Sequence, residues 1–308
     1  MNSNTPTSSR TPFEEVVIEI LGEETGGHGD HWEIFFGDVG DIVKQLPKVV
    51  QEGQIALTHA DSGSPMTYAL PQQEPKGALL VWPSPRLGVI AAIELGTQDG
   101  ANELISAYPY VSEGVEHTVR LEQVRLWPNR LEAQIRASIR TDEGWAITFF
   151  DPLFAANRVF YKKDELYKFV LAGFPYILET ADPKPIVIDD PENIRRLRGM
   201  MHPTDPEQRD SLEPLVFHTK GMAVFLERDS SADDYEFQGP VKSVAELDTE
   251  MLGQQVWRIR VTVHRLSDSD FDIDLYVTKK VLAGHKVPEV GEDVRGVLWL
   301  HGHLSSPF

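Results

Sequence analysis

Residues 131–140 read Leu-Glu-Ala-Gln-Ile-Arg-Ala-Ser-Ile-Arg, and apolar and polar side chains alternate over all ten positions. Successive side chains of a β-strand point to opposite faces, so this period of two predicts a strand with one apolar face. Val119–Trp127 precedes it, and the turn dipeptide Pro128-Asn129 between the two segments predicts a hairpin. We expect the polar side of this hairpin to face water.

Further strand signals follow on both sides of a proline-rich segment. Trp145–Phe150 and Tyr167–Leu178 complete a β-rich module over residues 116–180. A second, barrel-like module is expected over residues 211–308, and five strands suit a small barrel of the OB type. Its expected strands are Met222–Glu227, Tyr235–Val244, Val256–Arg265, Phe271–Val281 and Val294–His303.

Two of these strands carry complementary charges on their polar sides. Arg258 and Arg260 alternate with apolar residues in one strand, and Asp272 and Asp274 do so in the next. If the strands are neighbours, an arginine lies across from an aspartate, a pairing worth a few tenths to about 1 kcal/mol.

The rest of the chain has a weaker pattern. Residues 1–12 are polar and predict a disordered tail, and residues 13–115 predict an irregular α+β region in which Pro47 ends or kinks a short helix over Asp38–Val50. Residues 181–210 hold five prolines and predict a linker with one helix. Asp190 is its expected N-cap, Pro191 its first residue and Gly199 its stop. The expected fold class is therefore α+β, β-dominated, with antiparallel sheets that form two small barrel-like modules.

Composition excludes several classes of protein. The 308 residues include no cysteine, which excludes disulfides, a thiolate nucleophile and a thiolate zinc site. No apolar run is long enough for a membrane span or a signal peptide, so we expect a soluble, cytoplasmic protein without membrane contact. The net charge of -19 makes nucleic acid an improbable partner.

Standard catalytic motifs are absent from the sequence. It contains no Gly-x-Ser-x-Gly elbow, no P-loop and no dinucleotide fingerprint. The sequence leaves it uncertain whether the chain is an enzyme, although the missing motifs favour a protein without catalytic activity. No cofactor is expected apart from a possible divalent metal.

Histidines and a carboxylate suggest the metal alternative. His28, Asp30 and His31 lie in a glycine-rich segment, and His301 and His303 are two apart on an expected strand, so they project to one face. Such a set would suit a divalent metal and a metal-dependent hydrolase. The competing interpretation is an exposed loop and an exposed chain end, which we favour. The acidic run Asp268, Asp270, Asp272 and Asp274 lacks the glycine and glutamate of a calcium loop.

A basic and aromatic segment suggests a partner surface. Residues 116–200 carry equal numbers of acidic and basic side chains, whereas the flanking parts are acidic. Aromatic residues crowd residues 149–161 and more often form core than a binding surface. The candidate contact residues are Arg136, Arg140, Arg158, Tyr161, Lys162 and Lys163.

These observations favour a binding or interaction protein whose partner is a protein, in an unknown oligomeric state. A metal-dependent hydrolase is the first alternative. An acidic mimic of nucleic acid that blocks a DNA-binding protein is the second, suggested only by the charge.

Overall fold

A computed structural model describes residues 17–22, 27–55, 77–96, 101–139, 144–267 and 269–305. Half of these described residues lie in strands and 17% in helices, which confirms a β-dominated fold. The expected tail over residues 1–12, Arg140 and Asp268 lie outside the described residues. None of the helices in the described ranges is long and apolar enough to cross a membrane.

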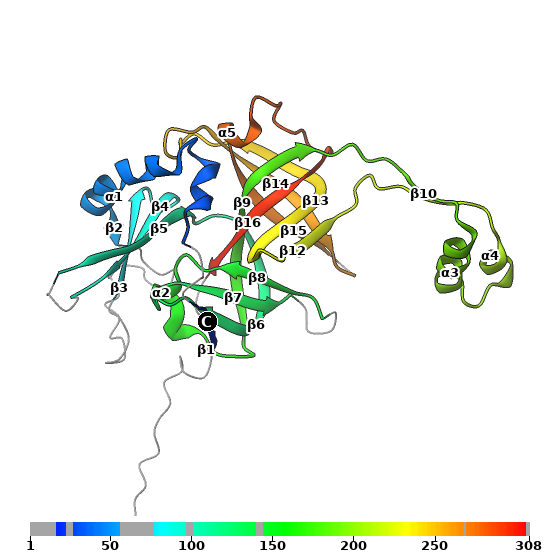
Figure 1. Ribbon diagram of the computed structural model, residues 1–308, viewed down its shortest axis with the longest axis horizontal. Coiled ribbons are helices and arrows are strands. Elements are labelled where there is room, and N and C mark those ends of the chain that lie inside the picture. The colour runs from blue at the N-terminus through cyan, green and yellow to red at the C-terminus, as the bar shows by residue number, and fades with distance from the viewer. Residues whose placement is uncertain are drawn as a thin grey trace, which may run out of the picture.

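A mixed sheet of ten strands forms the body of the protein (Figure 1). Its strands, in spatial order, are β1 (Val17–Ile20), β6 (Val115–Leu126), β7 (Ala133–Ser138), β8 (Ala146–Phe150), β16 (Asp293–Leu304), β9 (Leu166–Thr180), β15 (Asp270–Thr278), β14 (Val256–Arg265), β13 (Ser231–Glu246) and β12 (Val224–Arg228).

Two additional pairings connect strands that are not neighbours in this order. Strand β6 also pairs with β9, and β13 also pairs with β16. One circuit of pairings therefore runs through β6, β7, β8, β16 and β9, and another through β9, β15, β14, β13 and β16. Strands β9 and β16 belong to both circuits and pair along most of their length, from Val294 opposite Thr180 to Leu304 opposite Phe169.

Most strands pair antiparallel, as expected, but the large sheet is mixed. Strands β1 and β6, β15 and β9, and β16 and β8 pair in parallel. Parallel neighbours need a long connection between them, and here strands far apart in sequence meet through such crossovers. The predicted boundaries at 116–180 and 211–308 stay predictions, because strand pairing does not measure whether two parts fold separately.

The strands lie where the alternation predicted them, but the polar side chains at the start of β7 are buried. Leu131, Ala133 and Ile135 are buried as expected, yet Glu132 is 1% exposed and Gln134 is 6% exposed. The alternation shows only that the two faces differ in polarity. Here a second layer of the protein covers Glu132 and supplies two of its hydrogen-bond partners, whereas Gln134 donates to Asp233 of β13 in the same sheet.

This second layer is the N-terminal part of the chain. A four-stranded antiparallel sheet and three short helices make it up: β2 (Gln54–Ile55), β3 (Gly77–Pro83), β4 (Leu87–Glu94), β5 (Glu103–Val111), the 3-10 helices η1 (Asp30–Ile34) and η2 (Val39–Lys44), and α1 (Leu46–Glu52). Pro47 lies in the first turn of α1, so it starts a second helix rather than ending the one expected over Asp38–Val50.

Two hydrophobic cores hold the layers together. One contains inward-facing residues of the ten-stranded sheet, such as Leu298 and Leu300 of β16. The other joins the N-terminal layer to the opposite face of the shared strands, where Phe174 and Trp299 pack with residues such as Trp32. Three short helices complete the body: α2 (Phe154–Asn157), the 3-10 helix η3 (Arg158–Phe160) and α5 (Lys279–Leu282).

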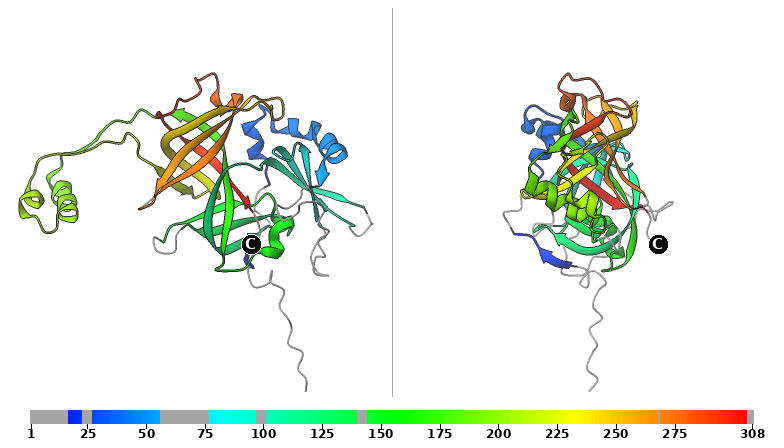
Figure 2. Two further views of the ribbon diagram at one scale, coloured as in Figure 1. Left: turned by 180° about the vertical axis from the view of Figure 1, so that it is seen from behind. Right: turned by 90° about the vertical axis from the view of Figure 1, so that its right-hand side faces the viewer.

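An arm over residues 181–223 extends away from the body (Figures 1 and 2). It consists of the ribbon β10 (Ile186–Ile188) and β11 (Leu215–Phe217) and, at its tip, helices α3 (Pro191–Met201) and α4 (Pro206–Asp210). The Asp190 carboxylate accepts from the Asn193 N–H, which confirms the predicted N-cap. The predicted stop at Gly199 is wrong: α3 continues to Met201, and the His202 N–H still bonds to the Arg198 carbonyl.

Candidate functional site

A cavity of about 880 Å³ lies on the side of the sheet that the N-terminal layer partly covers. Side chains of β6 and β7, the connection from β12 to β13 and the segment around η1 line it. Six carboxylates and three arginines are among the lining side chains: Glu19, Asp30, Glu227, Asp229, Asp233 and Asp234, with Arg125, Arg136 and Arg228. The cavity is therefore polar and predominantly acidic.

Asp233 is a buried carboxylate whose oxygens are well supplied with donors. It is 2% exposed. One oxygen accepts from Gln134 Nε2 at 2.9 Å and from Ser231 Oγ at 2.7 Å, and the other accepts from Trp299 Nε1 at 3.0 Å. Three donors therefore hold this carboxylate in one orientation at the cavity wall.

Asp234 has far weaker support. It is 8% exposed, and the Tyr176 hydroxyl donates to it at 3.2 Å. Burial, together with the charges of Asp233 and Asp30, raises the pKa of Asp234 to about 7. This carboxyl group therefore exchanges its proton near neutral pH, and its charge responds to whatever occupies the cavity.

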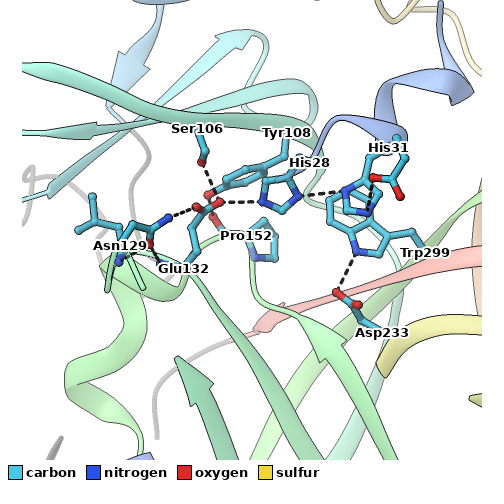
Figure 3. Close-up of polar contacts among 11 residues, drawn as sticks. His28, His31, Ser106, Tyr108, Asn129, Glu132, Pro152, Asp233 and Trp299 are labelled. Carbon is cyan, nitrogen blue, oxygen red and sulfur yellow. Dashed lines mark hydrogen bonds and ion pairs between the residues drawn. The ribbon is translucent and has the colours of Figure 1, made fainter. Parts of the chain in front are cut away.

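A chain of three side chains leads from the interior to the cavity (Figure 3). His28 Nε2 lies 2.7 Å from Glu132 Oε1, and His28 Nδ1 lies 2.9 Å from His31 Nδ1. Glu132 also accepts from Ser106 Oγ at 2.8 Å and from Asn129 Nδ2. All three residues of this relay, Glu132, His28 and His31, are buried, and the His31 ring lines the cavity.

Aromatic rings fix the two histidines. His28 stacks on Trp127 with ring centroids 4.8 Å apart, and His31 stacks on Trp299 at 3.6 Å. Burial, with smaller contributions from His28 and His301, lowers the pKa of His31 well below its usual value. His31 is therefore neutral at physiological pH, and its ring orientation is set by packing.

The structure places the four histidines of the predicted metal set in the interior rather than on an exposed loop and chain end, whereas the Asp30 side chain is 69% exposed. His301 is 1% exposed, and its ring meets that of Trp299 edge-on at 3.9 Å. Its pKa is lowered, first by burial and then by His28 and His303. His303 is also buried, beside Tyr110. Within the described ranges, no three histidine or carboxylate side chains are arranged to hold a metal ion.

The predicted partner residues do not form one surface. Arg136 lines the cavity and lies 3.6 Å from Glu122 and 3.7 Å from Glu227. Tyr161 is buried and donates to Asp151. Arg158 is also buried, and its Nη1 donates to the Arg130 carbonyl at 3.1 Å. Lys162 and Lys163 are exposed. Arg140 lies outside the described residues.

The sequence analysis did not predict that the arm is an exposed apolar element. Its ribbon pairs Ile186 with Phe217, Val187 with Val216 and Ile188 with Leu215, so all six side chains are apolar. The prolines and charges around this segment indicated a linker, whereas the short runs Ile186–Ile188 and Leu215–Phe217 were the available signal for strands.

No protein family model matches the chain, and no curated protein or solved structure is similar to it. The site must therefore be interpreted from its own geometry.

Proposed function

We propose that this chain is a protein-binding protein and that its arm makes the contact. One observation carries the proposal: both faces of the ribbon are apolar and open to solvent. Val187 and Val216 are 55% and 52% exposed on one face, and Ile186 and Phe217 are 50% and 36% exposed on the other.

Such a ribbon gains little stability from its own contacts. A two-stranded hairpin is marginal in water, and both outer edges of β10 and β11 retain unpaired backbone groups in the described sheet. Burial of one such apolar side chain is worth about 1.5–3 kcal/mol, so covering several of them would supply substantial binding free energy. A protein groove that adds a strand or covers a face would satisfy both features.

The tip of the arm indicates the chemistry of the partner. Met200 and Met201 are 65% and 50% exposed, and methionine adapts to varied apolar surfaces. Arg196 lies four residues before Met200 on α3, so the two share a helix face, and Arg195 is exposed beside it. The matching partner surface is an apolar groove bordered by carboxylates.

The body would then serve as a rigid support for the arm. We propose that each circuit of five strands is a small barrel and that the two barrels share β9 and β16. The pairing order and the inward-facing apolar residues of these strands support this interpretation.

The test compares arm variants with surface controls. We would place a photo-crosslinking amino acid at Met200, which is 65% exposed at the tip of the arm, and irradiate the protein in extract of its native host. A discrete crosslinked protein is expected, and it should be lost in the Val187→Ser/Val216→Ser variant. Val43→Ser/Val290→Ser is the matched control, because these valines are 62% and 65% exposed on the body. Equal crosslinking in the arm variant, or none in any protein, would refute the proposal.

A further inference from the structure

The arm holds a large share of the exposed apolar side chains of the protein. Eight of the nineteen large hydrophobic residues that are exposed in the described ranges lie in this segment, residues 181–223. They are Ile186, Val187, Met200, Met201, Leu212, Val216, Phe217 and Met222. Clustered apolar surface of this kind marks an interaction site, and the arm carries it away from the body (Figure 2).

The arm contributes little to the negative charge of the chain. Residues 181–223 carry eight carboxylates and six basic side chains, so they account for only -2 of the net charge of -19. Two bodies with so much negative charge repel each other in solution. A contact through the arms alone keeps the bodies of two molecules apart.

The end of the ribbon nearest the tip of the arm is acidic. The last pair of residues at this end is Ile188 and Leu215. Three exposed carboxylates lie within two residues of this pair: Asp189, Asp190 and Glu213. The Asp190 carboxylate caps α3, whereas Asp189 and Glu213 have no ion-pair partner among the residues that the structure describes.

The end of the ribbon nearest the body is basic. Its last pair is Ile186 and Phe217, and Thr219 Oγ1 donates to the Lys184 carbonyl at 2.9 Å, so the two segments stay side by side beyond the strands. The exposed basic side chains here are Lys184, His218 and Lys220. Asp182 is the one carboxylate among residues 182–185 and 218–221, and it lies 3.5 Å from Lys184. The ribbon therefore has two ends of opposite charge.

We infer that the partner of the arm is the arm of a second copy of this chain, with the two ribbons packed antiparallel about a two-fold axis. Val187 and Val216 are the middle pair of the ribbon and are more than half exposed on one face. An axis beside this pair packs the four valines of the two copies together. The inference rests on the proposed function, because it names the protein that the arm binds.

The charges determine the direction of the pairing. In the antiparallel arrangement the acidic end of each ribbon lies on the basic end of the other, so the surface is complementary to itself, as a two-fold contact requires. Parallel ribbons would place carboxylates beside carboxylates and lysines beside lysines, which is unfavourable. The contact is small, so we expect a dimer with a dissociation constant of about 1–100 µM.

The first test measures the mass of the purified full chain by sedimentation velocity between about 1 and 300 µM. A shift from the 34.6 kDa monomer to a dimer is expected. Val187→Ser/Val216→Ser should weaken the dimer by at least about tenfold, because it removes the apolar centre of the contact, and Val43→Ser/Val290→Ser should not. A wild-type chain that stays monomeric at the highest concentration would overturn the inference. A crosslink from Met200 to a different protein would then still support the proposed function, so the two can fail separately.

Exchanged charges test the direction of the pairing. Lys184→Glu/Lys220→Glu makes both ends of the ribbon acidic, and Asp189→Lys/Glu213→Lys makes both ends basic. Each variant alone should dimerise at least about tenfold more weakly, because like charges then meet at both ends of the contact. An equimolar mixture of the two variants should recover the affinity of the wild type, since every acidic end then meets a basic end. All four side chains are exposed, so the substitutions should leave the fold intact.

A charge reversal outside the arm is the matched control. Lys162→Glu/Lys163→Glu reverses two exposed lysines of the body and should leave dimerisation unchanged. Equal weakening in this control would show that only the total charge matters, which would refute the inference. A mixture of the two arm variants that dimerises no more tightly than either variant alone would refute it as well.

Discussion

His28 Nε2 lies 2.7 Å from Glu132 Oε1 although the two residues are 104 positions apart in the chain. The contact joins the segment before η1 to the start of β7, and both side chains are almost fully buried. It therefore ties the N-terminal layer to the ten-stranded sheet through a polar connection inside an aromatic cluster.

Replacement of Glu132 by leucine should destabilise the protein strongly. The change leaves donors on His28, Ser106 and Asn129 without their acceptor, and loss of one partner from a buried polar pair costs about 3–5 kcal/mol. Urea denaturation measures the free energy of unfolding. Glu122→Gln, whose partner Arg136 lies 3.6 Å away at the surface, should change it by less than about 1 kcal/mol. Similar losses in the two variants would show that the relay has no structural role.

Asp234 should make stability depend on pH. Its pKa rises from 3.8 to about 7 on folding, so the folded state binds a proton that the unfolded state has released. The stabilisation from the protonated group is complete below about pH 4 and is lost as pH rises through 7. Asp234→Asn stays neutral, so its free energy of unfolding relative to the wild type should increase between pH 4 and pH 7 and then level off. A constant difference over this range would contradict the raised pKa.

Arg260 and Asp274 should form a stronger ion pair than those at the surface. Arg260 donates to both Asp274 oxygens, at 2.8 and 3.0 Å, and the Asp274 side chain is 2% exposed. Arg260→Gln should lower the free energy of unfolding by about 1.5–3 kcal/mol. Arg295→Gln is the comparison, because Arg295 and Glu179 are 60% and 55% exposed and should contribute less than about 1 kcal/mol. Thermal denaturation of both variants distinguishes the pairs.

Limited proteolysis should cut the arm before the body. Arg195 and Arg196 are exposed on α3, and the tip makes mainly local contacts, so we expect trypsin to cleave there first. The two fragments should elute together in gel filtration, because β9 and β12 remain in one sheet. Mass spectrometry identifies the cut. Early cleavage within β6 or β14 would show that the body is less stable than proposed.

The sequence predicted the strands well because alternation is a local property. All nine strands expected after residue 116 are present, and the expected pairing of an arginine with an aspartate is confirmed by Arg260 and Asp274. The Asp190 N-cap was predictable for the same reason, since its partner is three residues away.

The candidate site was much less predictable, because burial of a polar side chain depends on distant parts of the chain. Nothing within a few residues of Glu132 or Gln134 indicates that His28 or Asp233 covers them. The interpretation that we favoured from the sequence placed His28, His31 and His301 on an exposed loop and an exposed chain end. They are instead buried among aromatic rings. The arm was assigned as a linker because its strands are only three residues long.

The shared pair β9 and β16 has a consequence for dissection of the molecule. A cut in the arm leaves β9 with the N-terminal part and β16 with the C-terminal part, so each part lacks one of the five strands of its circuit and neither is expected to fold alone. A destabilising substitution in one circuit should therefore also lower the stability of the other, and both circuits should unfold in a single thermal transition. Engineering by truncation would fail here, whereas replacement of the arm between Thr180 and Val224 would leave every strand of the body intact.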